Sequence, residues 1–166
     1  NVDPERIGII GFSAGGQLAS TVSTRHDQGD ASSEDMIEQV SSRPSFAILA
    51  YPVIAFEKPF THRGSQKNLL GENADPKLVA SLSNESAVNA ETPPTFLFHT
   101  AEDTAVPPQN SVAYFEALRR AGVSAEMHIF ETGRHGVGLA NGMPGTGAWP
   151  ELCKAWLKNR GMIESN

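Results

Sequence analysis

This sequence has a single cysteine, no cluster of basic residues and no long apolar run. Cys153 is the only cysteine, so no disulfide can form within the chain. The 13 lysines and arginines are outnumbered by 19 aspartates and glutamates, and the net charge is −6. Without a basic block, neither nucleic acid nor an anionic membrane surface is an expected partner. No apolar run approaches the roughly 20 residues that a membrane-spanning helix needs, so we expect no membrane span.

The length and composition are those of one soluble globular domain. With 166 residues, 39% of them hydrophobic and 19% charged, the chain can bury a sizeable core. We therefore expect a single domain over residues 1–166. The sequence begins at Asn1 rather than at a methionine, and no signal peptide precedes this residue, which favours a fragment or a mature form.

Residues 7–16 predict a strand, a sharp turn and a helix. Three isoleucines among the first four positions are typical of a strand that is buried on both faces. Gly11-Phe12-Ser13-Ala14-Gly15 then fits the pattern G-x-S-x-G, and the small residues over 17–25 follow as a helix. In such a nucleophile elbow the serine occupies strained backbone, and the flanking glycines let strand and helix approach closely.

Ser13 is the predicted nucleophile of this elbow. Its hydroxyl would stand above the sheet at a helix N-terminus, and the backbone N–H of Ala14 would be one oxyanion donor. The alternative is an ordinary glycine-rich turn, because G-x-S-x-G also occurs by chance. The pattern G-x-G-x-x-G of dinucleotide-binding proteins is absent, as is the Lys-Ser/Thr pair of a phosphate-binding loop.

Strand and helix patterns alternate along the rest of the chain, which predicts an α/β fold. The expected strands cover Phe46–Tyr51, Thr95–His99 and Ala125–Phe130, and the expected helices cover Pro108–Ala121 and Ala148–Arg160. This alternation predicts a mostly parallel sheet with helices on both faces, joined by right-handed crossovers. Functional groups then belong on the loops that leave the carboxyl ends of the strands.

Residues 53–94 are predicted to be an irregular, lid-like excursion. Prolines and glycines interrupt this segment, and only the pattern from Pro76 to Leu82 is clearly helical. An excursion of this length above a sheet is more often a substrate-facing loop than filler.

Two further loops supply the partners that a serine nucleophile needs. Asp103 follows the third expected strand and His135 follows the fourth. An imidazole can take the proton of Ser13, and a carboxylate can hold that imidazole in the required tautomer. Glu102, beside Asp103, is the alternative acid.

The order Ser13, Asp103, His135 is the order of the α/β-hydrolase fold. The remaining histidines are expected in strands (His99, His128) or loops (His26, His62), with only His62 in a stretch that we expect to line the pocket. No group of residues has zinc-ligand spacing, and we expect no metal and no cofactor.

These motifs resemble the C-terminal half of an α/β-hydrolase. The resemblance runs over essentially the whole chain, and within the superfamily the chain is similar to bacterial esterases related to carbohydrate acetylesterases and feruloyl esterases. The motifs that carry the resemblance are Gly11–Gly15, His99–Asp103 with Val106-Pro107, Gly133–Gly136, Thr61–Ser65, Asn68–Gly71 and Asn141. The resemblance implies a three-layer α/β-hydrolase fold and a serine carboxylesterase that acts on short, acetyl-type esters, including those of sugars.

The resemblance also implies what lies outside the sequence. Members of the superfamily carry further N-terminal strands and a His-Gly-Gly-type loop, which supplies the second oxyanion donor. Four C-terminal strands are expected here, so the strand at Ile7–Ile10 would be an exposed edge. Its expected partner is the N-terminal half of the same domain or a second copy of the chain.

Two other functions stay open at the level of sequence. The first is a serine peptidase of the prolyl-oligopeptidase type, whose catalytic domain carries similar acid and histidine loops. The second is a non-catalytic α/β-hydrolase module used for binding, which would not require serine, aspartate and histidine together. Dienelactone-hydrolase-like chemistry is disfavoured because that group normally has cysteine where this chain has Ser13.

Overall fold

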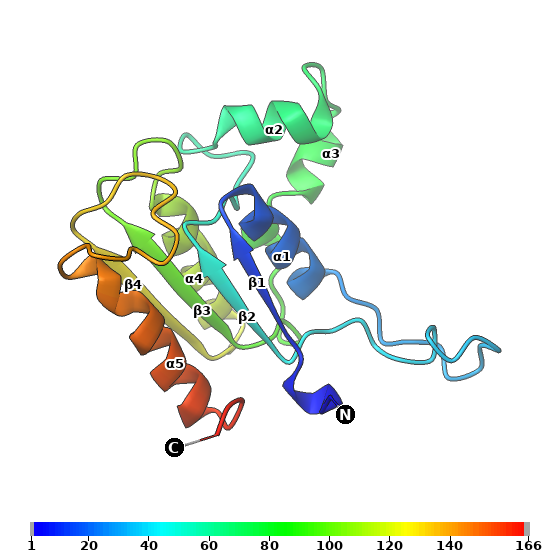
Figure 1. The fold of residues 1–166 in the computed structure, drawn as a ribbon. Helices are drawn as coiled ribbons and strands as arrows, with labels where there is room; N and C mark the ends of the chain where they lie inside the picture. The colour runs from blue at the N-terminus through cyan, green and yellow to red at the C-terminus, as the bar shows by residue number, and fades with distance from the viewer. Residues whose placement is uncertain (1, 165–166) are drawn as a thin grey trace.

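The computed structural model describes residues 2–164, and its centre is a parallel sheet of four strands (Figure 1). Along the sheet the strands follow their order in the chain. All three neighbouring pairs run parallel, as the alternation of strands and helices predicted. The strands are β1 (Gly8–Phe12), β2 (Phe46–Ala50), β3 (Thr95–Thr100) and β4 (Ala125–Phe130).

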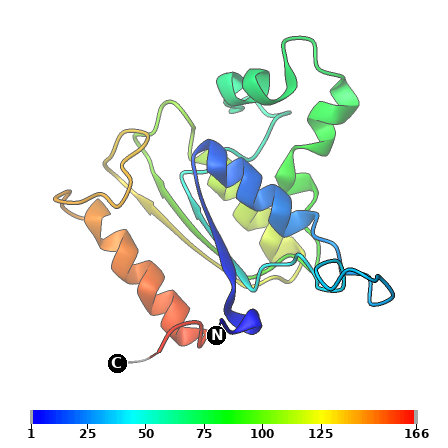
Figure 2. The same cartoon turned by 45° about the vertical axis from the view of Figure 1, so that its right-hand side comes forward.

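Helices cover both faces of the sheet and make a three-layer arrangement (Figure 2). Two helices, α1 (Ala14–Thr24) and α4 (Gln109–Arg120), lie against one face, and α5 (Trp149–Asn159) lies against the other. This is the expected α/β-hydrolase architecture in part, with four strands. None of the helices among residues 2–164 has both the length and the hydropathy needed to cross a membrane.

Successive side chains of the central strands point to opposite faces of the sheet and contribute to the core on each face. In β2, Leu49 packs with α1 and α4, whereas its neighbour Ala50 packs with the aromatic residues of α5. In β3, Leu97 likewise packs on the face covered by α1 and α4, and Phe98 packs on the face covered by α5. Consecutive side chains of a strand point to opposite faces, so an unbroken apolar run fits a strand that is covered on both sides.

The inner faces of two helices agree only in part with the apolar pattern, which predicts Val112, Phe115, Ala117 and Leu118 for α4 and Leu152, Ala155, Trp156 and Leu157 for α5. Ala117, Leu118 and Trp156 are buried as predicted. In α4, Val112 and Phe115 lie at the margin, and the fully buried aromatic residue is Tyr114. In α5, Trp149 and Trp156 are buried, whereas Ala155 is exposed. A helix of three turns accepts a rotation of its buried stripe by one residue, and the shape of the facing sheet decides which rotation packs.

The segment over residues 53–94 is more helical than the sequence indicated. Helix α3 (Pro76–Ser81) lies where it was expected, and a second helix, α2 (Arg63–Leu70), precedes it. His62 caps α2 by accepting a hydrogen bond from the Ser65 N–H, and Gly71 ends it. A polar sequence without an apolar stripe hid this helix, because periodicity is the main sequence signal for a helix.

The edge strand β1 pairs only with β2 among the described residues. Ile9 packs partly under α1, but Ile10, on the opposite face, is 52% exposed. Helix α5 packs mainly against β3 and contacts β1 at the last residue of that strand, where the Phe12 and Trp149 ring centroids are 6.4 Å apart. Burial of β1 on both faces, predicted from its isoleucines, is therefore not reached within residues 2–164.

Candidate active site

Ser13 stands on a strained turn between β1 and α1. Its φ of 53° and ψ of −121° lie in a region that residues other than glycine rarely occupy. Backbone hydrogen bonds hold the turn: the Ser13 N–H donates to the Ala50 carbonyl over 3.1 Å, and the Val53 N–H donates to the Ser13 carbonyl over 3.0 Å. The strain is therefore maintained by the end of the neighbouring strand.

Two glycines permit this close packing, and only one of them flanks the serine in the sequence pattern. A Cβ on Gly11 would lie 2.7 Å from the Ala19 Cβ, and a Cβ on Gly16 would lie 2.7 Å from the Pro52 Cα. A Cβ on Gly15 would meet nothing within 4 Å. Close approach therefore explains Gly11 and Gly16, but it does not explain the second glycine of G-x-S-x-G.

The N-terminus of α1 directs positive charge toward the serine. Ala14 is the first residue of the helix, so its N–H has no acceptor within the helix. The partial positive charge of a helix N-terminus favours a negative charge that develops beside it. The Ala14 N–H is therefore placed to serve as an oxyanion donor.

Three loops bring Ser13, His135 and Asp103 into one hydrogen-bonded chain. The Ser13 Oγ lies 2.7 Å from the His135 Nε2, and the His135 Nδ1 lies 2.6 Å from the Asp103 Oδ2. An ionised carboxylate only accepts hydrogen bonds, so the Nδ1 carries the proton and the Nε2 can accept the proton of Ser13. This is the arrangement that activates a serine hydroxyl for attack on a carbonyl carbon.

Asp103 is held as a carboxylate by several hydrogen bonds. Its other oxygen, Oδ1, accepts from the N–H groups of Ala105 and Val106 over 3.1 and 2.9 Å. Burial by itself would raise the pKa of Asp103, but the hydrogen bonds from His99, His135 and the Val106 N–H outweigh it and lower the pKa to about 2. The group is therefore ionised at neutral pH although it is buried.

Glu102, the alternative acid, points elsewhere. Its carboxylate accepts a hydrogen bond from the Gly133 N–H over 2.9 Å. The Thr100 hydroxyl donates to the carbonyl of the same glycine over 2.7 Å. Glu102 and Thr100 thus fasten the start of the histidine loop, whereas Asp103 faces the imidazole.

Tyr51 supports the imidazole from its other side. Its ring lies edge-on to the ring of His135, with the centroids 5.2 Å apart, and its hydroxyl accepts a hydrogen bond from the Gly138 N–H. Burial raises the pKa of Tyr51, so the phenol stays protonated. The loop that carries His135 is therefore fastened at both ends of its turn, by Glu102 and by Tyr51.

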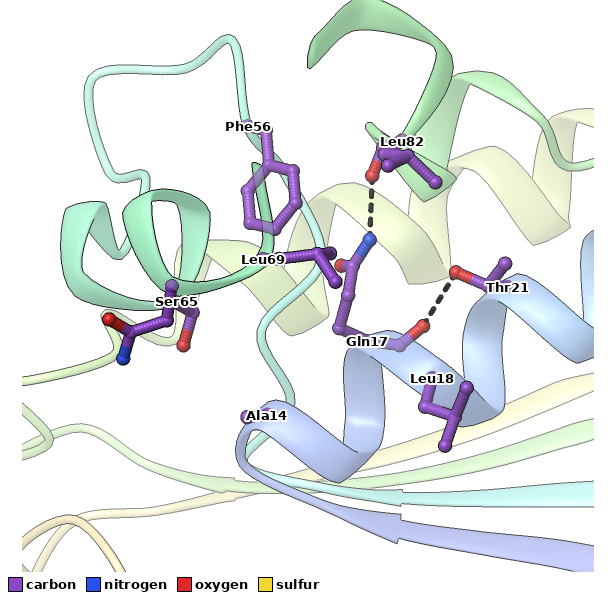
Figure 3. Close-up of a pocket in the computed structure, with 9 residues that line it drawn as sticks. Ala14, Gln17, Leu18, Thr21, Phe56, Ser65, Leu69 and Leu82 are labelled. Atoms are coloured by element: carbon purple, nitrogen blue, oxygen red, sulfur yellow. Dashed lines mark hydrogen bonds between the residues drawn. The ribbon is translucent and has the colours of Figure 1, made fainter. Parts of the chain in front are cut away.

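A groove of about 390 Å³ opens beside the first turn of α1 (Figure 3). Its floor is the stripe of α1 that begins at Ala14, and its far wall is α2. His62 itself is not among its lining residues, but Ser65, from the stretch that was expected to line the pocket, is. The lining residues are Ala14, Gln17, Leu18, Thr21, Phe56, Ser65, Asn68, Leu69 and Leu82.

The family follows from comparison with known sequences. Residues 1–159 match the prolyl oligopeptidase family, which amounts to nearly the whole chain. The chain belongs to the prolyl oligopeptidase family. This assignment agrees with the α/β-hydrolase resemblance and includes the peptidase branch that the sequence left open.

Three proteins similar to the chain carry names of esterases or ester hydrolases. An acetylxylan esterase of Xylanibacter ruminicola is 37% identical over 143 residues, which are 84% of this chain and 27% of the relative. The crystal structure of an acetyl ester-xyloside bifunctional hydrolase from Caldicellulosiruptor lactoaceticus is 50% identical, with a TM-score of 0.95. A carboxylesterase structure from Lactobacillus plantarum is 28% identical, with a TM-score of 0.77.

The chain spans only part of each of these proteins. It corresponds to 60% of the Caldicellulosiruptor structure and 62% of the Lactobacillus one, while 98% and 99% of this chain are covered. The match to the acetylxylan esterase covers about a quarter of that relative.

His99 lies beside Asp103, whereas the sequence predicted only that this histidine belongs to a strand. It is completely buried, its Nδ1 lies 2.8 Å from the Ser111 Oγ, and its Nε2 lies 2.9 Å from the Val106 carbonyl oxygen. The same Nε2 is 3.3 Å from the Asp103 Oδ2. The signal in the sequence was its spacing of four residues from Asp103, which carries no meaning until the loop geometry is known.

Proposed function

We propose that this chain carries the reaction centre of a serine carboxylesterase that hydrolyses short, acetyl-type acyl esters, including those of sugars. The observation that carries the proposal is the continuous hydrogen-bonded chain from the Ser13 hydroxyl through His135 to the buried carboxylate of Asp103. Support for the acetyl ester comes from the acetylxylan esterase and the acetyl ester-xyloside hydrolase, which share 37% and 50% of their aligned residues with this chain.

The proposed reaction has two steps of similar form. The Ser13 Oγ attacks the ester carbonyl carbon while its proton passes to the His135 Nε2, and the oxyanion is stabilised by the Ala14 N–H. The C–O bond to the alcohol breaks, and the alcohol leaves with the proton from His135. Water then attacks the acyl-enzyme and gives a proton to His135. The acid departs, and Ser13 regains its proton.

Removal of the nucleophile tests this proposal. In the full-length protein, Ser13→Ala should lower the turnover of an acetylated methyl xyloside by about 10⁴-fold or more. Ser32→Ala, at an exposed serine of the loop after α1, is the matched control and should keep full turnover. A folded Ser13→Ala protein that keeps more than a tenth of the activity would contradict the proposal.

The preferred substrate distinguishes esterase activity from peptidase activity. We expect acetyl esters to be cleaved faster than octanoyl esters and faster than prolyl peptide amides. Preferential cleavage of the peptide amides would assign peptidase activity instead. Substrate binding without any turnover would assign the non-catalytic binding module.

The free edge of β1 is proposed to pair with a further segment of the same protein. Support comes from the half-exposed Ile7 and Ile10 and from the 60% coverage of the Caldicellulosiruptor structure. Unpaired edge strands with apolar side chains favour pairing with another strand. Hydrogen exchange in the full-length protein should show protected amides over β1. Protection that appears only at concentrations where the protein dimerises would assign the edge to a second copy.

A further inference from the structure

The groove beside α1 starts at Ala14, next to Ser13, and is lined by none of the residues around His135. Its floor residues Ala14, Gln17, Leu18 and Thr21 are spaced as one face of a helix. Its other lining residues come from Phe56, α2 and the end of α3. No residue of the histidine loop, 131–145, lines it. The groove therefore begins at the residue that carries the oxyanion donor and does not extend over the histidine loop.

This position assigns the groove to one half of an ester. The oxygen of the departing alcohol must lie near the His135 Nε2 to receive its proton, and the carbonyl oxygen must face the Ala14 N–H. The acyl group takes the remaining direction from the carbonyl carbon. Because the groove starts at Ala14 and avoids the histidine loop, it suits the acyl half.

The volume of the groove is much larger than an acetyl group requires. At about 390 Å³ it falls in the range of sites that bury a whole small molecule. Its apolar lining includes the side chains of Phe56, Leu69 and Leu82. An acyl chain of several carbons therefore fits where acetyl would leave most of the space empty.

One buried polar atom in this wall has no partner. Gln17 is 5% exposed, and its Nε2 donates to the Leu82 carbonyl over 2.7 Å. A carbonyl only accepts, so the amide nitrogen must face Leu82 and the Oε1 must face the other way. The Oε1 has no hydrogen-bond partner among the described residues. Figure 3 shows it turned away from the Leu82 carbonyl.

We propose that Gln17 selects ester substrates whose acyl group carries a hydroxyl, which donates a hydrogen bond to the Gln17 Oε1 in this groove. An unpartnered buried acceptor costs free energy that a donor on the substrate recovers on binding. Gln17 lies one helical turn from Ala14, about 5 Å along the axis, so the hydroxyl belongs several carbons from the carbonyl. This inference rests on the proposed esterase function and extends it beyond acetyl.

Leu69 controls access to this acceptor. It lines the same groove as Gln17, from α2, and is itself 56% exposed. An exposed leucine can change rotamer at little cost, so a ligand can displace it and reach the Oε1. Leu69 is therefore the residue whose truncation should open the groove.

A matched pair of substrates tests the role of Gln17. Ethyl 6-hydroxyhexanoate and ethyl heptanoate differ only by a terminal hydroxyl in place of a methyl group, and ethyl acetate serves as the reference whose acyl group is too short to reach the Gln17 Oε1. In the full-length protein, Gln17→Met should lower the ratio of kcat/KM for the hydroxy ester over the heptanoate about tenfold. The ratio compares two substrates in one preparation, so a difference in the amount of active enzyme cancels. An unchanged ratio would overturn the proposal.

Binding provides a readout that does not need turnover. Calorimetry of Ser13→Ala with 6-hydroxyhexanoate and with heptanoate should show tighter binding of the hydroxy acid, and adding Gln17→Met should remove that preference. If the wild type fails to cleave any ester while this preference persists, the esterase function is wrong and the groove assignment stands. Equal binding of both acids, in a protein that cleaves ethyl acetate, overturns only the groove assignment.

A second variant keeps the test sound if Gln17→Met does not fold. Leu69→Ala should raise kcat/KM several-fold for both long esters. Leu78→Ala is the matched control, because Leu78 is a half-exposed leucine on α3 that does not line the groove. Equal effects of the two variants on the long esters would overturn the assignment of the groove to the acyl half.

Discussion

The His99 Nε2 lies 3.3 Å from the Asp103 Oδ2, the same carboxylate oxygen that faces the Nδ1 of His135. The Val106 carbonyl, 2.9 Å from this Nε2, can only accept a hydrogen bond, so the Nε2 carries a proton. One oxygen of Asp103 thus receives N–H groups from two imidazoles. His99 is buried and fixed by Ser111, which makes it a rigid support for the carboxylate.

Replacing His99 should lower activity by loosening Asp103. His99→Leu removes both the hydrogen bond to Asp103 and the donor to the Val106 carbonyl, and we expect kcat to fall about tenfold with little change in KM. His99→Gln keeps an N–H donor at this position and should recover part of the loss. Initial rates with an acetyl ester check this. A parallel loss of kcat in both variants would assign His99 a purely structural role.

The two neighbouring carboxylates should respond differently to loss of charge. Asp103→Asn should lower kcat about 10⁴-fold, because an amide in place of the carboxylate no longer enforces the required imidazole tautomer. Glu102→Gln keeps an oxygen that can accept from the Gly133 N–H and should cost less than tenfold. Turnover of an acetyl ester by both variants, with circular dichroism to verify folding, makes the comparison. The reverse order of effects would make Glu102 the acid.

Stability at low pH should depend on Asp103. Its pKa is lowered in the folded protein to about 2, so its contribution is present above the unfolded pKa near 4 and is lost as the pH falls toward 2. The shift corresponds to about 2 kcal/mol in the free energy of unfolding. Urea unfolding between pH 4 and pH 2 should show a shallower decline for Asp103→Asn than for the wild type. Parallel declines would contradict the lowered pKa.

The glycines of the elbow should not be equivalent. Gly11→Ala forces a Cβ against Ala19 and the backbone of Gly15 and should cost about 1–3 kcal/mol of stability. Gly15→Ala places its Cβ in open space in the first turn of α1 and should be neutral or stabilising by up to about 1 kcal/mol. Urea unfolding of the two variants decides this. Equal destabilisation would show that Gly15 is also needed for close packing.

Glu85 should destabilise the protein at neutral pH. It is buried, neither carboxylate oxygen has a hydrogen-bond partner among the described residues, and burial raises its pKa. The folded state then holds the proton more tightly than the unfolded state, so stability falls as the pH rises from the unfolded pKa through the folded one.

Replacement of Glu85 by a neutral isostere tests this sign. Glu85→Gln should raise the free energy of unfolding by about 1 kcal/mol at pH 7 and by much less at pH 4. The exposed Glu34→Gln is the matched control and should show no difference between the two pH values. A gain for Glu85→Gln that is the same at both pH values would contradict the raised pKa.

Most of the strands and the elbow could be predicted from the sequence because their signals are local. The apolar runs of β2 and β3 match a strand that is covered on both faces, and β4 has the predicted bounds. The pattern around Ser13 specifies a turn between a strand and a helix, because the glycines and the strained serine belong to one contiguous stretch. Asp103 and His135 followed from their positions at the carboxyl ends of strands.

Only the tertiary structure decided how these loops face one another. Glu102 and Asp103 are adjacent, and nothing local distinguishes which carboxylate meets an imidazole 32 residues away. His99 contacts Asp103 only because the loop after β3 turns back over the end of that strand. The unpartnered oxygen of Gln17 exists because its amide nitrogen bonds a carbonyl 65 residues further on. Contacts between distant residues depend on packing, and packing has no period that a sequence displays.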